Sequence, residues 1–494
     1  MTIVKGVIRV NKPFLAGLDR LFLIVLLAAV AGCAPRGGAT LTPLPPTVTI
    51  APTVAPTETT VVPVPINPQV TNCNITPPPP QPNSPLEPGT LSRDIPCAFT
   101  FAPPDTLDNL QLGFDFNSWL TFAGLNAPAD SDALIGQGSG VGGDAPTVWE
   151  QWKEHYEIML PDGKTPAAWG TPRLIPPACQ SLATSSAATL GKNPLVLSVV
   201  VQPFDTGPLI DQAGEYVLYG ISVNRPMFEF LFQNQLYNQA GQANFAGDML
   251  FPQGSVIAGT TGFIGAIMVK SSWKVMGPQD DPSQFHTTTA LMYTPPSDNP
   301  KIEEACAQKT VGLVGLHVVH KTQTEPQWIW ATFEHVRNAP TQAEVDRNSL
   351  LADYNFYQPG CAETVCPINQ PPPRPWNPNV IPFPHNFTSQ VIRLISLTSE
   401  VSDLNTSFQS LLKGTVWENY MLISTQWPTD GKSKTDPTGA PFPVYLANTT
   451  LETYSQGEVP QASSSCMDCH GNATDTQGRA SDFTFIPQRA EKTP

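Results

Sequence analysis

The sequence is poor in charge, and positive charge is the scarcer kind. Only 14% of its 494 residues are Asp, Glu, Lys or Arg, and 26 Lys and Arg stand against 41 Asp and Glu, which gives a net charge of −15. An acidic chain repels a phosphate backbone, so we expect no binding to nucleic acid. The sequence also lacks the G-x-S-x-G, H-E-x-x-H and P-loop motifs. Their absence argues against the hydrolase classes that depend on them.

The apolar run near the N-terminus is too short for a transmembrane helix. Leu21–Val30 has ten residues, whereas a helix needs about 20 to cross a bilayer. The run follows a basic stretch and leads into Val30-Ala31-Gly32-Cys33, which resembles the lipobox of bacterial lipoproteins. This resemblance implies that residues 1–32 are a signal peptide, that Cys33 is lipidated, and that the protein is an exported lipoprotein of the outer membrane or cell envelope, periplasmic or surface-exposed. The alternative is an ordinary signal peptide in which Cys33 has no special role.

Proline is concentrated in two stretches of the chain. Sixteen of the 57 residues from Ala34 to Thr90 are Pro, and Pro367–Pro384 is the second Pro-rich stretch. Proline fixes φ and has no N–H to donate, so such stretches favour an extended chain over packed helices or sheets. We therefore predict a tether over residues 33–90 and a connector over residues 367–385.

The remaining sequence has a globular composition and predicts an α+β fold. We expect a β-rich body over residues 91–366 and a mostly helical C-terminal region over residues 386–494. Runs rich in β-branched residues predict strands, and apolar residues at three- and four-residue spacing predict helices. The predicted strands are Leu195–Phe204, Tyr216–Val223, Gly262–Met276 and Val311–Thr322. The predicted helices are Thr147–Leu160, Pro226–Gln239 and Gln390–Tyr420.

Near the C-terminus, Cys466-Met467-Asp468-Cys469-His470 has the C-x-x-C-H spacing of covalent haem attachment. Two thiols at this spacing can add to the two vinyl groups of one haem, and the next residue places an imidazole beneath the iron. The alternatives are a thioredoxin-like redox pair and half of a zinc site. No βαβ unit surrounds the motif, however, and a second C-x-x-C or an H-x-x-x-H is missing. We therefore predict one haem c, attached to Cys466 and Cys469, with His470 as the proximal iron ligand.

The C-terminal position of the motif excludes a self-contained class I cytochrome c domain. Only 24 residues follow His470, and they contain neither Met nor His. A sixth iron ligand must then come from the preceding body. Residues 310–336 have the pattern of two antiparallel strands, in which alternation places His335 on an apolar face and places His320 on that face opposite Ile329. We predict His335 as the distal ligand and His320 as the second candidate; a buried structural histidine is the alternative for each.

Several segments of the sequence resemble bacterial proteins classed only as cytochrome c family proteins. These segments are VKSSWK, GLHVVHKT, WIWATFEHVRNAP, NTTLETYSQ and SCMDCH, and the resemblance spans much of Gly262–Phe485. It implies haem binding and matches Cys466, Cys469 and His470 to the attachment motif. It implies no substrate.

These observations predict a membrane-anchored monohaem c-type cytochrome that exchanges electrons with other redox proteins and contacts the membrane through its lipid. Two alternatives remain: a peroxidase-like haem oxidoreductase with an open distal site, and a β-rich body that binds or converts a substrate with the haem as an accessory. In an oxidising compartment the other cysteines of the exported chain predict disulfides, and Cys361–Cys366 is the obvious short-loop pair. These cysteines are Cys73, Cys97, Cys179, Cys306, Cys361 and Cys366.

Overall fold

The computed structural model describes residues 69–493 apart from 78, 80–84, 102–105, 138–144, 186–192, 299–300, 375, 377–386, 431–438 and 458–463. These described residues belong to one compact unit, Glu58–Pro494. The predicted signal peptide with Cys33, most of the tether and part of the connector lie outside the described residues. Within the described ranges, no helix combines the length and the hydropathy that a membrane span requires.

The described elements include both helices and strands, which confirms the α+β class. The strands of the main sheet are β4 (Lys153–Glu154), β5 (Leu195–Leu197), β6 (Leu218–Val223), β9 (Ile267–Val275), β10 (Thr287–Thr294), β13 (Ala305–Lys321), β14 (Trp328–His335), β15 (Tyr420–Pro428) and β16 (Pro441–Phe442). The shorter strands are β1 (Thr71–Asn72), β2 (Asn74–Thr76), β3 (Pro96–Phe99), β7 (Ser255–Ala258), β8 (Thr261–Phe263), β11 (Ser297–Asp298) and β12 (Lys301–Ile302). The helices are α1 (Leu107–Leu125), α2 (His155–Ile158), α3 (Gln180–Ser185), α5 (Arg225–Gln233), α6 (Gln239–Asn244), α7 (Gln342–Asp346), α8 (Ser399–Leu411) and α10 (Cys466–His470).

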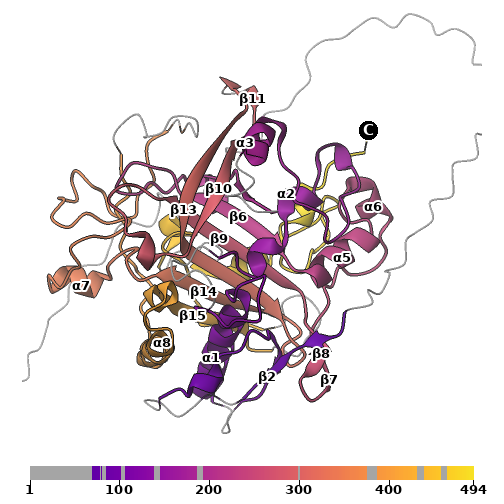
Figure 1. Ribbon diagram of the computed structural model, residues 1–494, viewed down its shortest axis with the longest axis horizontal. Coiled ribbons are helices and arrows are strands. Elements are labelled where there is room, and N and C mark those ends of the chain that lie inside the picture. Colours follow the sequence, from indigo (N-terminus) through magenta and orange to yellow (C-terminus); the bar gives the residue numbers. More distant parts are fainter. Residues whose placement is uncertain are drawn as a thin grey trace, which may run out of the picture. The chain divides into compact units, whose positions relative to one another are not determined.

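The main sheet organises the unit (Figure 1). Counted over the described residues it has nine strands, in the order β16-β15-β14-β13-β9-β6-β4, with β10 paired to β13 and β5 paired to β10. Strand β13 pairs with β10 through its N-terminal half and with β9 and β14 through its C-terminal half. In the β13–β14 pair His320 stands opposite Ile329, which confirms the register expected from the sequence.

Helices α1 and α8 cover one face of the sheet and lie side by side next to β15 in Figure 1. From α1, Trp119 stacks on Phe408 of α8 with ring centroids 4.8 Å apart, and Phe122 stacks on Phe333 of β14 at 4.3 Å. All four rings are buried. This aromatic cluster packs α8 against α1 and α1 against Phe333 of β14, which points to this face because only every second side chain of a strand does so.

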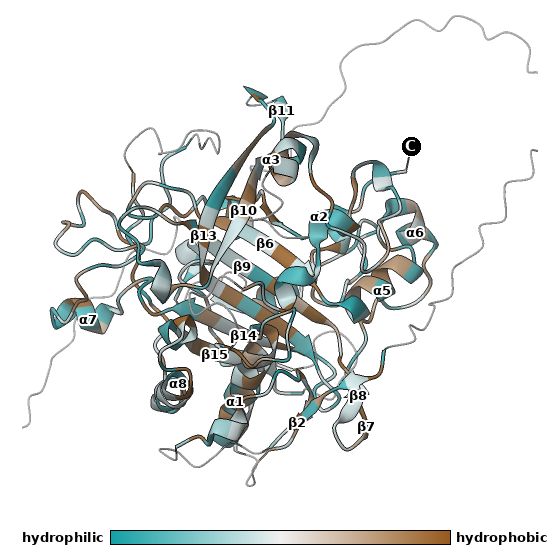
Figure 2. Ribbon diagram, in the orientation of Figure 1, coloured by the Kyte–Doolittle hydropathy of each residue, from teal (hydrophilic) through white to brown (hydrophobic). Residues whose placement is uncertain are grey.

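The opposite face of the sheet is covered by α5 and by the C-terminal segment after α10. Val319 of β13 and Trp330 of β14 form one buried cluster there with Met467, Phe483 and Ile486. Figure 2 shows apolar residues interspersed with more polar ones along the central strands, whereas the peripheral helix α7 is largely hydrophilic. The two faces therefore bury separate apolar layers, and the C-x-x-C-H motif belongs to the second.

The predicted strands form, with shifted ends. The strand predicted at Leu195–Phe204 is shorter than expected and forms only β5. The strands β6 and β9 form inside the predicted ranges Tyr216–Val223 and Gly262–Met276. The strand predicted at Val311–Thr322 begins six residues earlier, at Ala305, as β13. Pairing with β10 supports this extension, although its outer residues are exposed and lack the apolar pattern of a core strand.

The prediction of a mostly helical C-terminal region is wrong. Helix α8 forms inside Gln390–Tyr420 with Thr398 as its N-cap, but the chain then enters the main sheet as β15. The helix predicted over Thr147–Leu160 is wrong as well, because β4 interrupts it to pair with β6. Tertiary pairing outweighs a weak helical pattern in both places.

Disulfides join all the predicted cysteines. The pairs among the described residues are Cys73–Cys97, Cys179–Cys306 and Cys361–Cys366, so the short-loop pair is confirmed. Cys73 lies between β1 and β2, and β1 pairs with β8. Regular structure therefore begins inside the segment predicted as a tether, before Leu91.

Replacing Phe333 by Ala should lower the free energy of unfolding by about 3–5 kcal/mol, because it leaves a cavity among fully buried rings. Urea denaturation measures the change. Leu351→Ala is the control, since Leu351 is 47% exposed, and its effect should stay within about 0.5 kcal/mol. Equal losses in the two variants would contradict the packing described for α1 and α8.

Candidate functional site

The C-x-x-C-H motif forms the short helix α10. Ser465 is its N-cap, with a side chain that accepts a hydrogen bond from the backbone N–H of Asp468. The N–H of Met467 donates to Oε1 of Gln426 on β15 at 2.8 Å, and the Met467 side chain is buried in the second apolar layer. The motif is thus attached to the main sheet through both its backbone and its middle side chain.

A cavity of about 540 Å³ lies against α10. This volume falls within the range of about 300–1,000 Å³ that is typical of cofactor sites. Cys466, Cys469 and His470 line the cavity together with apolar side chains of the sheet and of the C-terminal segment. These apolar residues include Met268, Val319, Trp330, Leu446, Phe485 and Ile486.

One ring nitrogen of His470 is held by a hydrogen bond, which leaves the other available to bind a metal ion. Nδ1 lies 2.8 Å from the backbone oxygen of Phe483. Since a carbonyl can only accept, Nδ1 carries the proton and Nε2 keeps its lone pair. Burial, partly offset by the hydrogen bond to Phe483, lowers the pKa of His470 to about 4, so the ring is neutral near pH 7. A neutral imidazole whose other nitrogen donates to a carbonyl is the usual form of a metal-ligating histidine.

The motif's two cysteines are free. Burial raises the pKa of Cys469 to about 11 and that of Cys466 well above its ordinary value. A thioredoxin-like pair needs the opposite, a thiol with a lowered pKa. Within the described ranges, no three His, Cys, Asp or Glu residues come together to hold a metal ion. The thioredoxin-like alternative loses support, and the residues fit covalent haem.

A charged group also lines the cavity. Nε2 of His317 lies 3.0 Å from both carboxylate oxygens of Glu452, and Nζ of Lys270 lies 3.6 Å from Oε1 of Glu452. Burial would raise the pKa of Glu452, but the electrostatic interactions with His317 and Lys270 and the hydrogen bond to His317 outweigh burial and lower the pKa to about 2. The carboxylate is therefore ionised at neutral pH.

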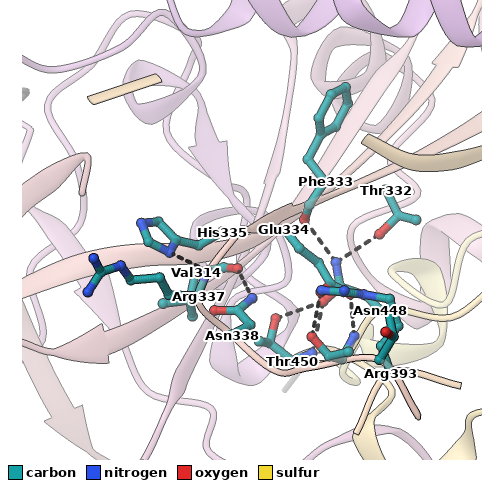
Figure 3. Close-up of polar contacts among 12 residues, drawn as sticks. Val314, Thr332, Phe333, Glu334, His335, Arg337, Asn338, Arg393, Asn448 and Thr450 are labelled. Carbon is teal, nitrogen blue, oxygen red and sulfur yellow. Dashed lines mark hydrogen bonds and ion pairs between the residues drawn. The ribbon is translucent and has the colours of Figure 1, made fainter. Parts of the chain in front are cut away.

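Glu452 belongs to a loop that a buried polar network ties to β14 (Figure 3). Glu334 accepts hydrogen bonds from the backbone N–H and the hydroxyl of Thr449, both at 2.6 Å, and pairs with Arg393 at 2.7 Å. Asn448 donates to Thr332 and to the carbonyl of Phe333, and its backbone N–H donates to Glu452 at 3.1 Å. The network thereby fixes the position of the Glu452 carboxylate in the wall of the cavity.

Neither predicted distal histidine lines the cavity. Nε2 of His335 bonds to the carbonyl of Gln284 at 2.9 Å, and its ring stacks on Phe285. In Figure 3 His335 points away from the group around Glu334. His320 is buried opposite Ile329, with neither ring nitrogen hydrogen-bonded within the described structure. Both rings occupy the face of α1 and α8, whereas the cavity opens on the other face, so the prediction of His335 and His320 as ligands is corrected.

His317 is the histidine that the sheet brings to the cavity. It is three residues from His320 on β13, so alternation turns it to the other face, beside Val319 and Trp330. This placement could be read from the strand pattern. No sequence pattern pointed to Glu452 or to the Phe483 carbonyl, because they reach the site through loops.

No protein-family model, curated protein or solved structure matches this chain. The function must therefore be inferred from the motif and from the residues that line the cavity.

Glu334→Gln should lower the free energy of unfolding by about 3–5 kcal/mol, because it leaves the Arg393 guanidinium buried without its counterion. Urea denaturation measures the loss. Glu303→Gln removes a carboxylate that is 82% exposed and should change stability by no more than about 1 kcal/mol. If Glu334→Gln lowered the free energy of unfolding by no more than the control does, the network would not hold the loop in place.

Proposed function

We propose that the protein is a membrane-anchored monohaem c-type cytochrome that carries electrons. One observation carries the proposal. The two free cysteines of the described chain and the unprotonated nitrogen of His470 meet at one cavity, and each other described cysteine is in a disulfide. Because every other described cysteine is paired, these two half-buried thiols are the ones available for a bond to a cofactor.

The cysteines and the histidine of the motif would hold different parts of a haem. Cys466 and Cys469 would carry the two thioether bonds, and His470 would hold the iron through Nε2. The bound group would supply reversible one-electron chemistry. The apolar wall limits access of water to the site, which tunes the potential of a buried redox centre. Lys270 and Arg489 place positive charge on the wall, suited to the carboxylates of a porphyrin.

The proposed location follows from the cysteines and the N-terminal sequence. Disulfides persist in oxidising compartments outside the cytoplasm, where haem c is also attached in bacteria. We propose export, lipidation at Cys33 and a Pro-rich tether that holds the folded unit away from the membrane. The net charge of −15 suits docking to redox proteins with a basic surface.

A second candidate is a haem enzyme, and the group of His317, Glu452 and Lys270 favours it. An imidazole held by an ionised carboxylate at a cofactor cavity can move a proton to or from a bound substrate. The same imidazole could instead complete the coordination of an electron carrier. The spin state of the iron separates the two: a carrier has low-spin six-coordinate iron, whereas an enzyme with an open site has high-spin iron.

Changing Cys466 and Cys469 together to Ser should abolish covalent haem, because both attachment bonds are lost. The pyridine haemochrome of the denatured, acid-acetone-extracted protein measures it. The matched control changes Cys361 and Cys366 to Ser, which removes the other closely spaced pair from an exposed loop. The control should keep its haem. Covalent haem in the first variant would refute the assignment.

His317→Ala should convert low-spin ferric iron to high-spin iron if the protein is a carrier, since His317 lines the cavity together with the motif's own His470. Optical and EPR spectra report the spin state. His335→Gln is the control and should leave both spectra unchanged, because His335 lies on the other face of the sheet. An unchanged spectrum in His317→Ala would assign the sixth position elsewhere, and a high-spin parent protein would favour the enzyme.

A further inference from the structure

The carbonyl that holds His470 lies in an unusual piece of backbone. Phe483 accepts from Nδ1 of His470, and both Asp482 (φ 49°) and Phe483 (φ 62°) have left-handed conformations. Residues other than Gly seldom adopt positive φ, and two in succession persist only when neighbouring contacts enforce them. The position of this carbonyl must therefore be set by the groups around Asp482.

Three groups from the sheet and its loops hold Asp482. Nζ of Lys321 forms a short ion pair with Oδ2 of Asp482, and the N–H of Phe251 donates to the same oxygen at 2.7 Å. Nε1 of Trp328 donates to the backbone carbonyl of Asp482 at 2.8 Å. Both the side chain and the peptide group before Phe483 are thus fixed.

Lys321 is an unusual residue for a structural contact of this kind. It is 3% exposed, and its ammonium lies 5.0 Å from the ring centroid of Trp328. Burying an ammonium group is costly unless it is paired and hydrogen-bonded. Lys321 closes β13 and Trp328 opens β14, opposite each other in the sheet. The pair thus connects the turn at Asp482 to the paired ends of β13 and β14 in the main sheet.

We propose that Lys321, Asp482 and Trp328 are positioning residues for the haem iron. They hold the Phe483 carbonyl against Nδ1–H of His470 and thereby set the orientation and basicity of the proximal imidazole. None of the three lines the cavity, so they act only through Phe483 and His470. This inference rests on the proposed function, because it requires that His470 bind iron.

The hydrogen bond from Nδ1–H of His470 to the Phe483 carbonyl predicts in which direction the reduction potential will change. A carbonyl held close to Nδ1–H makes the imidazole a stronger donor and favours ferric iron. Loosening the carbonyl weakens that donation. The reduction potential should rise in any variant that frees Asp482.

The experiment measures the reduction potential and the ferric EPR spectrum of the holoprotein and of Lys321→Met, Asp482→Asn and Trp328→Phe. The matched control is Lys153→Met, which also removes a buried lysine from an ion pair, but one whose ammonium bonds to Glu157 and Thr171 and not to Asp482. We expect a higher potential and shifted g values in the three variants, and unchanged values in the control. Haem content is determined separately by the pyridine haemochrome.

Each result decides one of the two proposals. A parent protein without covalent haem refutes the proposed function. If the parent binds haem, loaded variants with the parent's potential and g values overturn the positioning role. Should Lys321→Met fail to fold, Trp328→Phe decides alone, since it removes one hydrogen bond and keeps an aromatic ring. A shift of the same size in Lys153→Met also overturns the role, because the effect would then come from general loosening.

Discussion

The alternation of side chains along β13 and β14 is the constraint on which the site depends. Each strand gives neighbouring residues to opposite layers, so Val319 and Trp330 join the C-terminal segment while Phe333 joins α1 and α8. The same rule turns His317 toward the cavity and His335 away from it. A slip of one residue in either strand would exchange the two layers. The strand register therefore decides which groups His470 can meet.

The sequence was sufficient to predict what depends on local pattern. The β13–β14 pairing, the α+β class and the Cys361–Cys366 disulfide follow from alternation, composition and spacing. Helix α1 was missed because it is buried over most of its length and its polar residues, such as Asp115, Asn117 and Thr121, are spread around the helix, so it lacks the one-sided stripe that marks a surface helix. Strand β15 was not predicted, and its residues fell in the region expected to be mostly helical, because its partner β14 lies some 90 residues earlier and such pairing leaves little local signal.

The choice of His335 shows where pattern reasoning fails. Alternation correctly placed it on an apolar face, but the sequence did not say which face the C-terminal segment covers. That depends on long-range packing of Met467 and Phe483. The same limit applies to the backbone oxygen of Phe483, because a carbonyl has no residue type by which to recognise it. The buried ion pair of Lys321 with Asp482 holds this segment, and that of Glu334 with Arg393 lies beside the loop at Thr449.

The central claim is that the C-x-x-C-H motif holds a porphyrin at this cavity. Mass spectrometry of the tryptic peptide that contains Cys466 and Cys469, taken from protein produced with export and haem attachment intact, tests it most directly. The account predicts a peptide heavier by one haem, with both thiols blocked to alkylation. A bare peptide with two free thiols or an internal disulfide would contradict it.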